Sequence, residues 1–286
     1  MKRILLTGCD GQLGRAFQEL AAGRPGEDWR FTDKAQLDIC SAPAVREAVR
    51  HIRPDVLINC AAYTAVDQAE NEPGPARRLN VDAVAHLAEA CRKQGVRLIH
   101  YSTDYAYHNG LNRPLREDDP PRPKSVYGRT KLAGEEAALS LCDHSLVLRT
   151  SWVYSPFGHN FVRTMLRLGA ERKCLRVVYD QVGTPTYGPD LAGATLALLD
   201  LPEPPAGLLN FSNEGVTSWY DFARRILELA RLNCRVEAIL SAEYPTPARR
   251  PPYSLLDKSR FKSLSDYAIP HWEDSLRQCL RRLGVG

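Results

Sequence analysis

The sequence places a tyrosine and a lysine four residues apart, Tyr127 and Lys131, in the stretch "SVYGRTKLAGEEA". On a helix, residues at this spacing lie on one face, so the phenol and the ammonium would be neighbours. A cation beside a phenol favours the phenolate and lowers the tyrosine pKa from its usual value of about 10. A tyrosine of that kind can act as a general acid. The alternative is a surface pair without function, and other motifs must decide between the two interpretations.

The elements that would position this pair predict an α/β fold. In the first half, apolar runs such as "RILLTG", "DVLINCAA" and "VRLIHYSTD" alternate with helical patterns such as "GQLGRAFQELAA" and "PARRLNVDAVAHLAEACRKQG". Apolar strands separated by helices are typical of a parallel sheet covered on both faces. We therefore predict a Rossmann-like doubly wound parallel sheet in residues 1–150, completed by a segment near 177–212. Residues 151–286 would form most of a smaller C-terminal lobe, interleaved with the first domain.

Glycines between the first predicted strand and helix indicate a dinucleotide site. Gly8, Gly11 and Gly14 in "TGCDGQLG" permit a tight turn and a close approach of backbone to a pyrophosphate, with Gln12 and Leu13 at the start of the helix. The spacing is G-x-x-G-x-x-G, whereas dehydrogenases carry G-x-G-x-x-G, and a plain strand-to-helix connection is the alternative. The position in the first βα turn favours the dinucleotide.

The ends of later strands add candidates for cofactor binding. Asp33 follows the second strand, where an acidic residue would bind the adenosine ribose hydroxyls. Its neighbour Lys34 would tolerate a 2'-phosphate, so NADH and NADPH both stay open, and a solvated Asp-Lys pair is the alternative. Ligands bind at the carboxyl ends of strands in open α/β sheets. The further candidates at such ends are Asp38, Ile39, Ala62, Tyr63 and Thr64.

Composition excludes several other classes of protein. The 286 residues are 44% hydrophobic and 25% charged, with a net charge of +4 and no dense basic run, so nucleic acid and anionic membranes are not expected as partners. No apolar stretch approaches the ~20 residues of a membrane span, and "MKRILLTG" is no signal peptide, so we expect a cytoplasmic protein. The eight cysteines form no C-x-x-C pair and the histidines show no ligand spacing, so we expect reduced thiols and no metal site.

Several motifs together resemble the extended short-chain dehydrogenase/reductase family. These are the glycine turn, "YSTDYAY" and "YGRTK". In order and spacing, "NCAAYTAVDQAENEP", "LRTSWVY", "TMLRL", "WYDFA" and "YPTPARRP" are similar to the members of that family that reduce dTDP-4-keto sugars. The resemblance runs from Met1 to the last predicted helix. It implies an oxidoreductase that uses NADPH or NADH to reduce the C4 keto group of a dTDP-sugar, the last step in making dTDP-L-rhamnose.

The resemblance also implies roles for individual residues. Tyr127 would protonate the C4 oxygen, while Lys131 would hold the nicotinamide ribose and lower the tyrosine pKa. Thr103 would hydrogen-bond the reacting oxygen, Asp104 would contact the sugar, and Trp152 would lie against it. A turn or helix cap is the alternative for "STD", and a core position is the alternative for the tryptophan.

Three polar residues would hold the diphosphate of the substrate by the same resemblance. They are Asn160, Arg249 and Arg250, and guanidinium groups suit bidentate phosphate binding. Solvated surface arginines are the alternative. The chain departs from the family after "STDY", where Tyr107 and His108 replace the usual "VFDG" and put the conformation of that loop in doubt.

Metal binding is a second point of departure. Some relatives form dimers through magnesium held by an acidic residue just after the third glycine, where this chain has Arg15 and Ala16. A magnesium-bridged dimer is therefore doubtful, while a homodimer of another kind stays open.

Two rival functions stay open. One is another nucleotide-sugar enzyme of the family, such as an epimerase, which would retain its NAD through the cycle. The other is a non-enzymatic relative, like the regulatory subunit of methionine adenosyltransferase. The complete set of catalytic candidates and "RTSWVY" favour the reductase.

Overall fold

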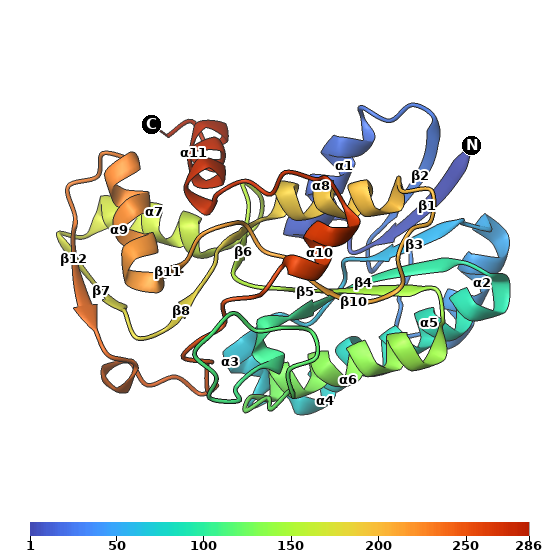
Figure 1. Ribbon diagram of the computed structural model, residues 1–286, viewed down its shortest axis with the longest axis horizontal. Coiled ribbons are helices and arrows are strands. Elements are labelled where there is room, and N and C mark those ends of the chain that lie inside the picture. The colour runs from blue at the N-terminus through green and yellow to red at the C-terminus, as the bar shows by residue number, and fades with distance from the viewer. Residues whose placement is uncertain (286) are drawn as a thin grey trace.

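Six parallel strands form the central sheet of the computed structural model, which describes residues 1–285 (Figure 1). In spatial order they run β10-β5-β4-β3-β1-β2, and every neighbouring pair is parallel. The strands are β1 (Lys2–Thr7), β2 (Glu27–Thr32), β3 (Val56–Asn59), β4 (Arg97–Thr103), β5 (Ser145–Thr150) and β10 (Gly207–Asn210). This architecture confirms the predicted Rossmann-like doubly wound sheet, and residues far along the chain supply its sixth strand.

Two apolar cores form because side chains alternate between the faces of each strand. Ile4 of β1 packs on one face with Phe17 of α1 and Leu191 of α8, while Leu5 packs on the other with Leu87 of α5. The first face is covered by α1 (Gln12–Ala21) and α8 (Gly188–Leu199). The second is covered by α2 (Ala42–Ile52), α5 (Ala83–Gln94) and α6 (Val126–Leu141). The four inner strands β1, β3, β4 and β5 are thus buried on both sides, and the parallel pairing brings the carboxyl ends of all six strands to one edge.

The helical pattern "PARRLNVDAVAHLAEACRKQG" does form a continuous helical run, but a π-helical turn divides it. The chain forms α4 (Pro73–Arg77), a π-helical turn (Arg78–Asp82) and then α5. Asn80 lies in that turn, where its amide accepts a hydrogen bond from the backbone N–H of Tyr63 and donates to Thr130 of α6. A Cβ on Gly134 of α6 would overlap the carbonyl oxygen of Asn80, so the helix and the turn touch backbone to backbone. π-helical turns of this kind are frequent at functional sites.

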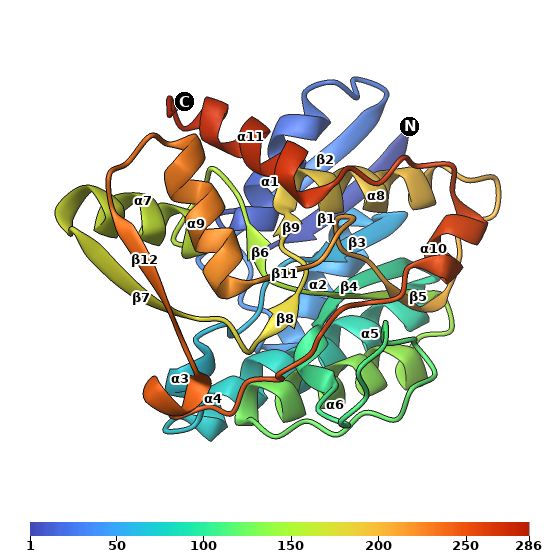
Figure 2. The ribbon, with the colours of Figure 1, turned by 60° about the vertical axis from the view of Figure 1, so that its left-hand side comes forward.

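A third apolar core lies in the C-terminal lobe, whose helices and strands Figure 2 shows. Its helices are α7 (Phe161–Glu171), α9 (Trp219–Leu229) and α11 (Trp272–Arg282), and they enclose Phe222 and Leu276. The other elements beyond β5 are β6 (Val153–Tyr154), β7 (Cys174–Val178), β8 (Val182–Gly183), β9 (Thr186–Tyr187), β11 (Thr217–Ser218), β12 (Arg235–Ile239) and α10 (Ser259–Leu264). The strands β7, β8 and β9 follow one another closely, within residues 174–187. Within residues 1–285, no helix has the length and apolar character to cross a membrane.

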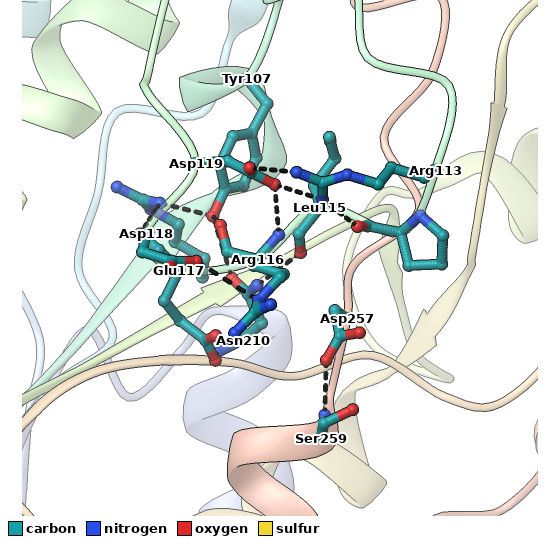
Figure 3. A network of polar contacts seen from close by, with 12 residues as sticks. Tyr107, Arg113, Leu115, Arg116, Glu117, Asp118, Asp119, Asn210, Asp257 and Ser259 are labelled. Atoms are coloured by element: carbon teal, nitrogen blue, oxygen red, sulfur yellow. Dashed lines mark hydrogen bonds and ion pairs between the residues drawn. The ribbon is translucent and has the colours of Figure 1, made fainter.

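Tyr107 anchors the loop between β4 and α6, the segment where the sequence departs from its family (Figure 3). Its ring is fully buried, and its hydroxyl donates to the carbonyl of Arg116 at 2.8 Å and accepts from Arg149 at 2.5 Å. The Arg149 guanidinium also forms a buried ion pair with Glu135 of α6 and lies 4.7 Å from the centre of the Tyr107 ring. Arg149 therefore links this loop directly to α6.

Candidate active site

The N-terminus of α6 presents Tyr127 and Lys131 beside the end of β4. Ser125 caps the helix, because its hydroxyl accepts a hydrogen bond from the backbone N–H of Gly128 at 3.0 Å. One helical turn separates Tyr127 from Lys131, as the four-residue spacing predicts. Lys131 as a residue is only 3% exposed, and its ammonium donates to the carbonyl oxygen of Tyr101 at 2.5 Å. Helix α6 therefore holds the Tyr127 and Lys131 side chains in fixed positions beside the carboxyl edge of the sheet.

The expected lowering of the tyrosine pKa is wrong for this structure. Burial raises the pKa of Tyr127 to about 12, and the neighbouring Thr103 opposes the shift only in part. Burial also lowers the pKa of Lys131 to about 8, against the effect of Glu135. The physical reason is that the environment withdraws water from both groups, which disfavours the phenolate and the ammonium alike. Tyr127 therefore carries its proton at neutral pH, which is the state a proton donor needs.

Thr103 and Asp104 join the pair from the end of β4. The Thr103 hydroxyl donates to Asp104 Oδ1 at 3.0 Å and accepts from the backbone N–H of Tyr105 at 3.2 Å. The second carboxylate oxygen of Asp104 is buried and has no hydrogen-bond partner within residues 1–285. Burial raises the pKa of Asp104 to about 6, although the nearby hydroxyl groups of Ser254 and Thr103 oppose the shift. A buried acceptor without a donor is a ready partner for a ligand hydroxyl.

The glycine turn forms an open hollow that fits a dinucleotide. Its volume is about 590 Å³, and its walls include Gly8, Gly11, Asp33 and Lys34. Gly8 has φ +74°, and a Cβ there would lie 2.6 Å from the backbone nitrogen of Ala61, so only glycine is accommodated. Helix α1 begins without a side-chain cap, which leaves backbone N–H groups at its N-terminus available to a phosphate. The hollow therefore adjoins the glycine turn and the N-terminus of α1, and its role in binding a pyrophosphate stays a prediction.

The remaining cofactor candidates lie along the same edge in different surroundings. Ile39 is buried in the core, whereas the Asp38 carboxylate accepts from the backbone N–H of Cys40 at 3.0 Å. The backbone N–H of Tyr63 donates to the Asn80 side chain, and the Tyr63 hydroxyl donates to the Glu72 carboxylate at 2.8 Å. Leu13 packs partly buried against the core, Gly14 is buried in α1, Ala62 is partly exposed, and Thr64 is exposed.

Asn160 lies at the cofactor side of the structure. Its amide donates to Gln12 of α1 at 3.0 Å and to the carbonyl of Ser155 at 2.8 Å, while its oxygen caps α7 by accepting from Arg163. Its polar atoms are therefore engaged in joining the glycine turn to the C-terminal lobe. The diphosphate role stays a prediction.

A cavity of about 730 Å³ opens beside the catalytic candidates. Tyr105 lines it, and the Tyr105 ring meets Tyr127 edge-on at 5.3 Å between ring centres. Arg250 also lines the cavity, and its guanidinium forms an ion pair with the Asp67 carboxylate at 2.7 Å. This ion pair holds the segment "TPARRP" against α3 (Val66–Ala69). Arg249 is exposed. Sequence reasoning assigned no role to the other lining residues, among them Phe161, Gln181, Trp219 and Tyr244. The quoted motif "WYDFA" begins with Trp219 and was the available signal.

Trp152 has an unusual backbone just after β5. Its φ is +48°, a left-handed conformation that costs a bulky residue on the order of 1–3 kcal/mol. One face of its indole stacks on Trp219, with ring centres 3.7 Å apart and planes 9° from parallel. A sugar can therefore meet only the part of the Trp152 ring that Trp219 leaves open.

No cluster of three or more metal-ligating side chains occurs in the described part of the chain, residues 1–285. The eight cysteines are free thiols, and five of them are buried. Magnesium independence stays a prediction.

Known proteins with similar sequences and structures agree with this geometry. The family model of the RmlD substrate binding domain matches residues 1–285. The chain is 40% identical to the dTDP-4-dehydrorhamnose reductase of Escherichia coli, over 98% of this chain and 97% of that one. The crystal structure of a dTDP-4-dehydrorhamnose reductase from Clostridium acetobutylicum superposes with a TM-score of 0.95 and 37% identity, over 99% of this chain and 100% of that one.

A further solved structure bears on the cofactor. It is the dTDP-4-dehydrorhamnose reductase of Bacillus anthracis in complex with NADP, which superposes with a TM-score of 0.94 and 36% identity over 99% of this chain and 100% of that one. These matches confirm the resemblance found in the motifs. The chain belongs to the family of the RmlD substrate binding domain.

Proposed function

We propose that the chain catalyses the NAD(P)H-dependent reduction of the C4 keto group of dTDP-4-dehydro-L-rhamnose, which yields dTDP-L-rhamnose. The observation that carries the proposal is the meeting of Tyr127, Lys131 and Thr103 at the carboxyl edge of the sheet. Tyr105, whose ring meets Tyr127 edge-on, lines a cavity of the size that small-molecule sites require, and the glycine turn forms a separate hollow. Relatives with this activity in their names are similar over nearly the whole chain.

Each catalytic candidate has one task in this proposal. The bound nicotinamide supplies a hydride to C4 of the sugar. Tyr127 gives its hydroxyl proton to the carbonyl oxygen, so that the C=O bond becomes an alcohol and Tyr127 becomes a phenolate. The Lys131 ammonium stabilises that phenolate and holds the nicotinamide ribose. When substrate binds, Thr103 would turn its one hydroxyl proton from Asp104 Oδ1 to the reacting oxygen, which favours charge developing there.

Substrate and cofactor are held by the residues around this centre. We propose that Asp104 accepts a hydrogen bond from a sugar hydroxyl, since its buried oxygen has no partner in residues 1–285. Asp33 and Lys34 would contact the adenosine ribose at the rim of the hollow. Arg250 would approach the diphosphate from the cavity wall, oriented by Asp67.

The test measures the oxidation of NADPH and NADH when the protein is given dTDP-4-dehydro-L-rhamnose, with other nucleotide keto sugars as controls. Tyr127→Phe keeps the ring and removes the acid, so we expect it to fold, bind cofactor and lose ~10²–10⁴-fold in kcat. Tyr267→Phe is the matched control, because it removes a hydroxyl that only donates to the carbonyl of Asp190. Near-wild-type turnover by folded Tyr127→Phe would contradict the assignment of the proton donor.

The same assay separates the rival functions. An epimerase returns the hydride within each cycle and would consume no NADPH, and a regulatory relative would neither turn over the sugar nor need Tyr127. A cytoplasmic location and a homodimer remain proposals, to be examined by cell fractionation and by the mass of the protein in solution.

A further inference from the structure

The stacked pair Trp152 and Trp219 joins two parts of the fold. Trp152 follows β5 of the central sheet, and Trp219 is the first residue of α9 in the C-terminal lobe. β8 and β11 form an antiparallel pair at the N-terminal end of α9, with Gly183 opposite Thr217 (Figure 2). The pairing delivers Trp219 to the indole of Trp152, with ring centres 3.7 Å apart.

The surroundings of the pair leave the Trp152 indole little freedom. A Cβ on Gly183 would lie 3.0 Å and 3.1 Å from two carbons of that indole, so a side chain there would displace it. The Trp152 carbonyl accepts from the backbone N–H of Thr186 at 3.2 Å. Trp152 itself has a left-handed backbone conformation. A bulky residue keeps such a conformation only where contacts with the surrounding structure hold it in place, and the contacts above are of that kind.

Trp219 is itself held firmly. Ser218 caps α9 by accepting from the backbone N–H of Asp221 at 3.0 Å. Phe161 of α7 packs against the Trp219 ring with 4.6 Å between ring centres. Trp219 therefore offers Trp152 a flat and fixed surface, while it also forms part of the cavity wall.

We infer that Trp219 is a positioning residue for the reaction, because its flat face holds the Trp152 indole in the orientation that seats the sugar beside Tyr127. The inference rests on the proposed function. It predicts that Trp219 acts through Trp152 rather than through its own contact with the nucleotide. The two residues should then behave as one unit in sugar recognition.

The experiment compares Trp219→Leu, which keeps apolar volume without a flat face, with Trp219→Phe, which keeps the face. Trp152→Ala and the Trp152→Ala/Trp219→Leu double variant complete a cycle. The matched control is Tyr220→Ala, because Tyr220 is the next aromatic residue of α9 and lines a separate surface groove with Arg224. Readouts are kcat, KM, thermal unfolding, and calorimetric affinities for dTDP-L-rhamnose, dTDP and NADPH.

We expect Trp219→Leu to raise KM and to weaken dTDP-L-rhamnose binding at least tenfold, with dTDP and NADPH affinities within twofold of the wild type. Trp219→Phe should restore most of the loss, and Trp219→Leu should add less than twofold to Trp152→Ala. Additive losses in the double variant, or equal weakening of dTDP and dTDP-L-rhamnose, would overturn the inference. The affinity cycle needs no turnover, so a wild type that binds dTDP-L-rhamnose but does not oxidise NADPH refutes the proposed function separately. A wild type that binds no dTDP-L-rhamnose refutes both.

Discussion

The buried ammonium of Lys131 should destabilise the folded chain at neutral pH. Burial lowers its pKa from 10.5 to about 8, and each pKa unit corresponds to about 1.4 kcal/mol. The charged form therefore costs roughly 3 kcal/mol relative to the unfolded chain. The unfolded chain binds more protons than the folded chain between these two pKa values, so stability should rise with pH in that window. The penalty is complete below about pH 8 and is relieved as the pH rises toward 10.5.

Lys131→Met removes the charge and keeps a stem of similar length. The substitution also removes the hydrogen bond from Lys131 to the Tyr101 carbonyl, a loss of about 1 kcal/mol. We therefore expect the free energy of unfolding at pH 7 to rise by roughly 2 kcal/mol, although activity and cofactor affinity fall. At pH 10 the folded wild type has already lost the charge, so the gain should disappear.

Urea unfolding at pH 7 and pH 10 measures this difference. Lys124→Met is the control, since Lys124 is exposed and its substitution should change the unfolding free energy little at either pH. A Lys131→Met protein that is less stable than the wild type at pH 7 would refute the reasoning. So would a gain of the same size at both pH values, because it could not arise from the titration of Lys131.

Three further predictions concern stability, cofactor and metal. Tyr107→Phe should lower the free energy of unfolding by about 1–3 kcal/mol in urea titrations, because Arg149 and the Arg116 carbonyl each lose a buried partner; an unchanged midpoint would count against this. Affinities for NADH and NADPH should agree within about tenfold, or ~1.4 kcal/mol, in fluorescence titrations, since Asp33 and Lys34 share the rim of the hollow, and strict use of one would be the contrary result. Activity should survive EDTA, because Arg15 and Ala16 offer no carboxylate to bind magnesium. Loss of activity in EDTA, with recovery of activity when magnesium is added, would contradict this prediction.

Local patterns allowed the central sheet and the tyrosine-lysine pair to be predicted. All four residues of β3 are buried, so its sequence is an apolar run that ends in Asn59, and the preceding helix α2 buries Val45 and Val49, four residues apart. The spacing of Tyr127 and Lys131 brings the two side chains together only on a helix, and the segment is a helix, α6. These signals act over a few residues, which is why the sequence alone displays them.

Contacts between distant segments could not be predicted in this way. Arg250 forms an ion pair with Asp67, and Asn160 forms a hydrogen bond with Gln12, although each pair is far apart in the sequence. No local sequence pattern around Arg250 or Asn160 indicates these partners. The direction of the Tyr127 pKa shift has the same origin. It depends on how much water the folded surroundings remove, and the nearby lysine in the sequence suggested the opposite effect.

The contact between Gly134 and Asn80 limits which sequences the catalytic helix can tolerate. Gly134 lies seven residues beyond Tyr127, about 10 Å along α6, and touches neither of the proposed ligands. A methyl group there would stand 3.1 Å from the carbonyl carbon of Asn80 and overlap its oxygen, so α6 would have to move outward as a rigid rod and carry Tyr127 with it. Displacements of about 1 Å can slow an oriented reaction ~10²-fold. Gly134→Ala should therefore lose turnover while Gly26→Ala, with no neighbour within 4 Å, should not. Natural variation in this helix is then constrained by the distance between two backbones, even at a position with no chemistry of its own.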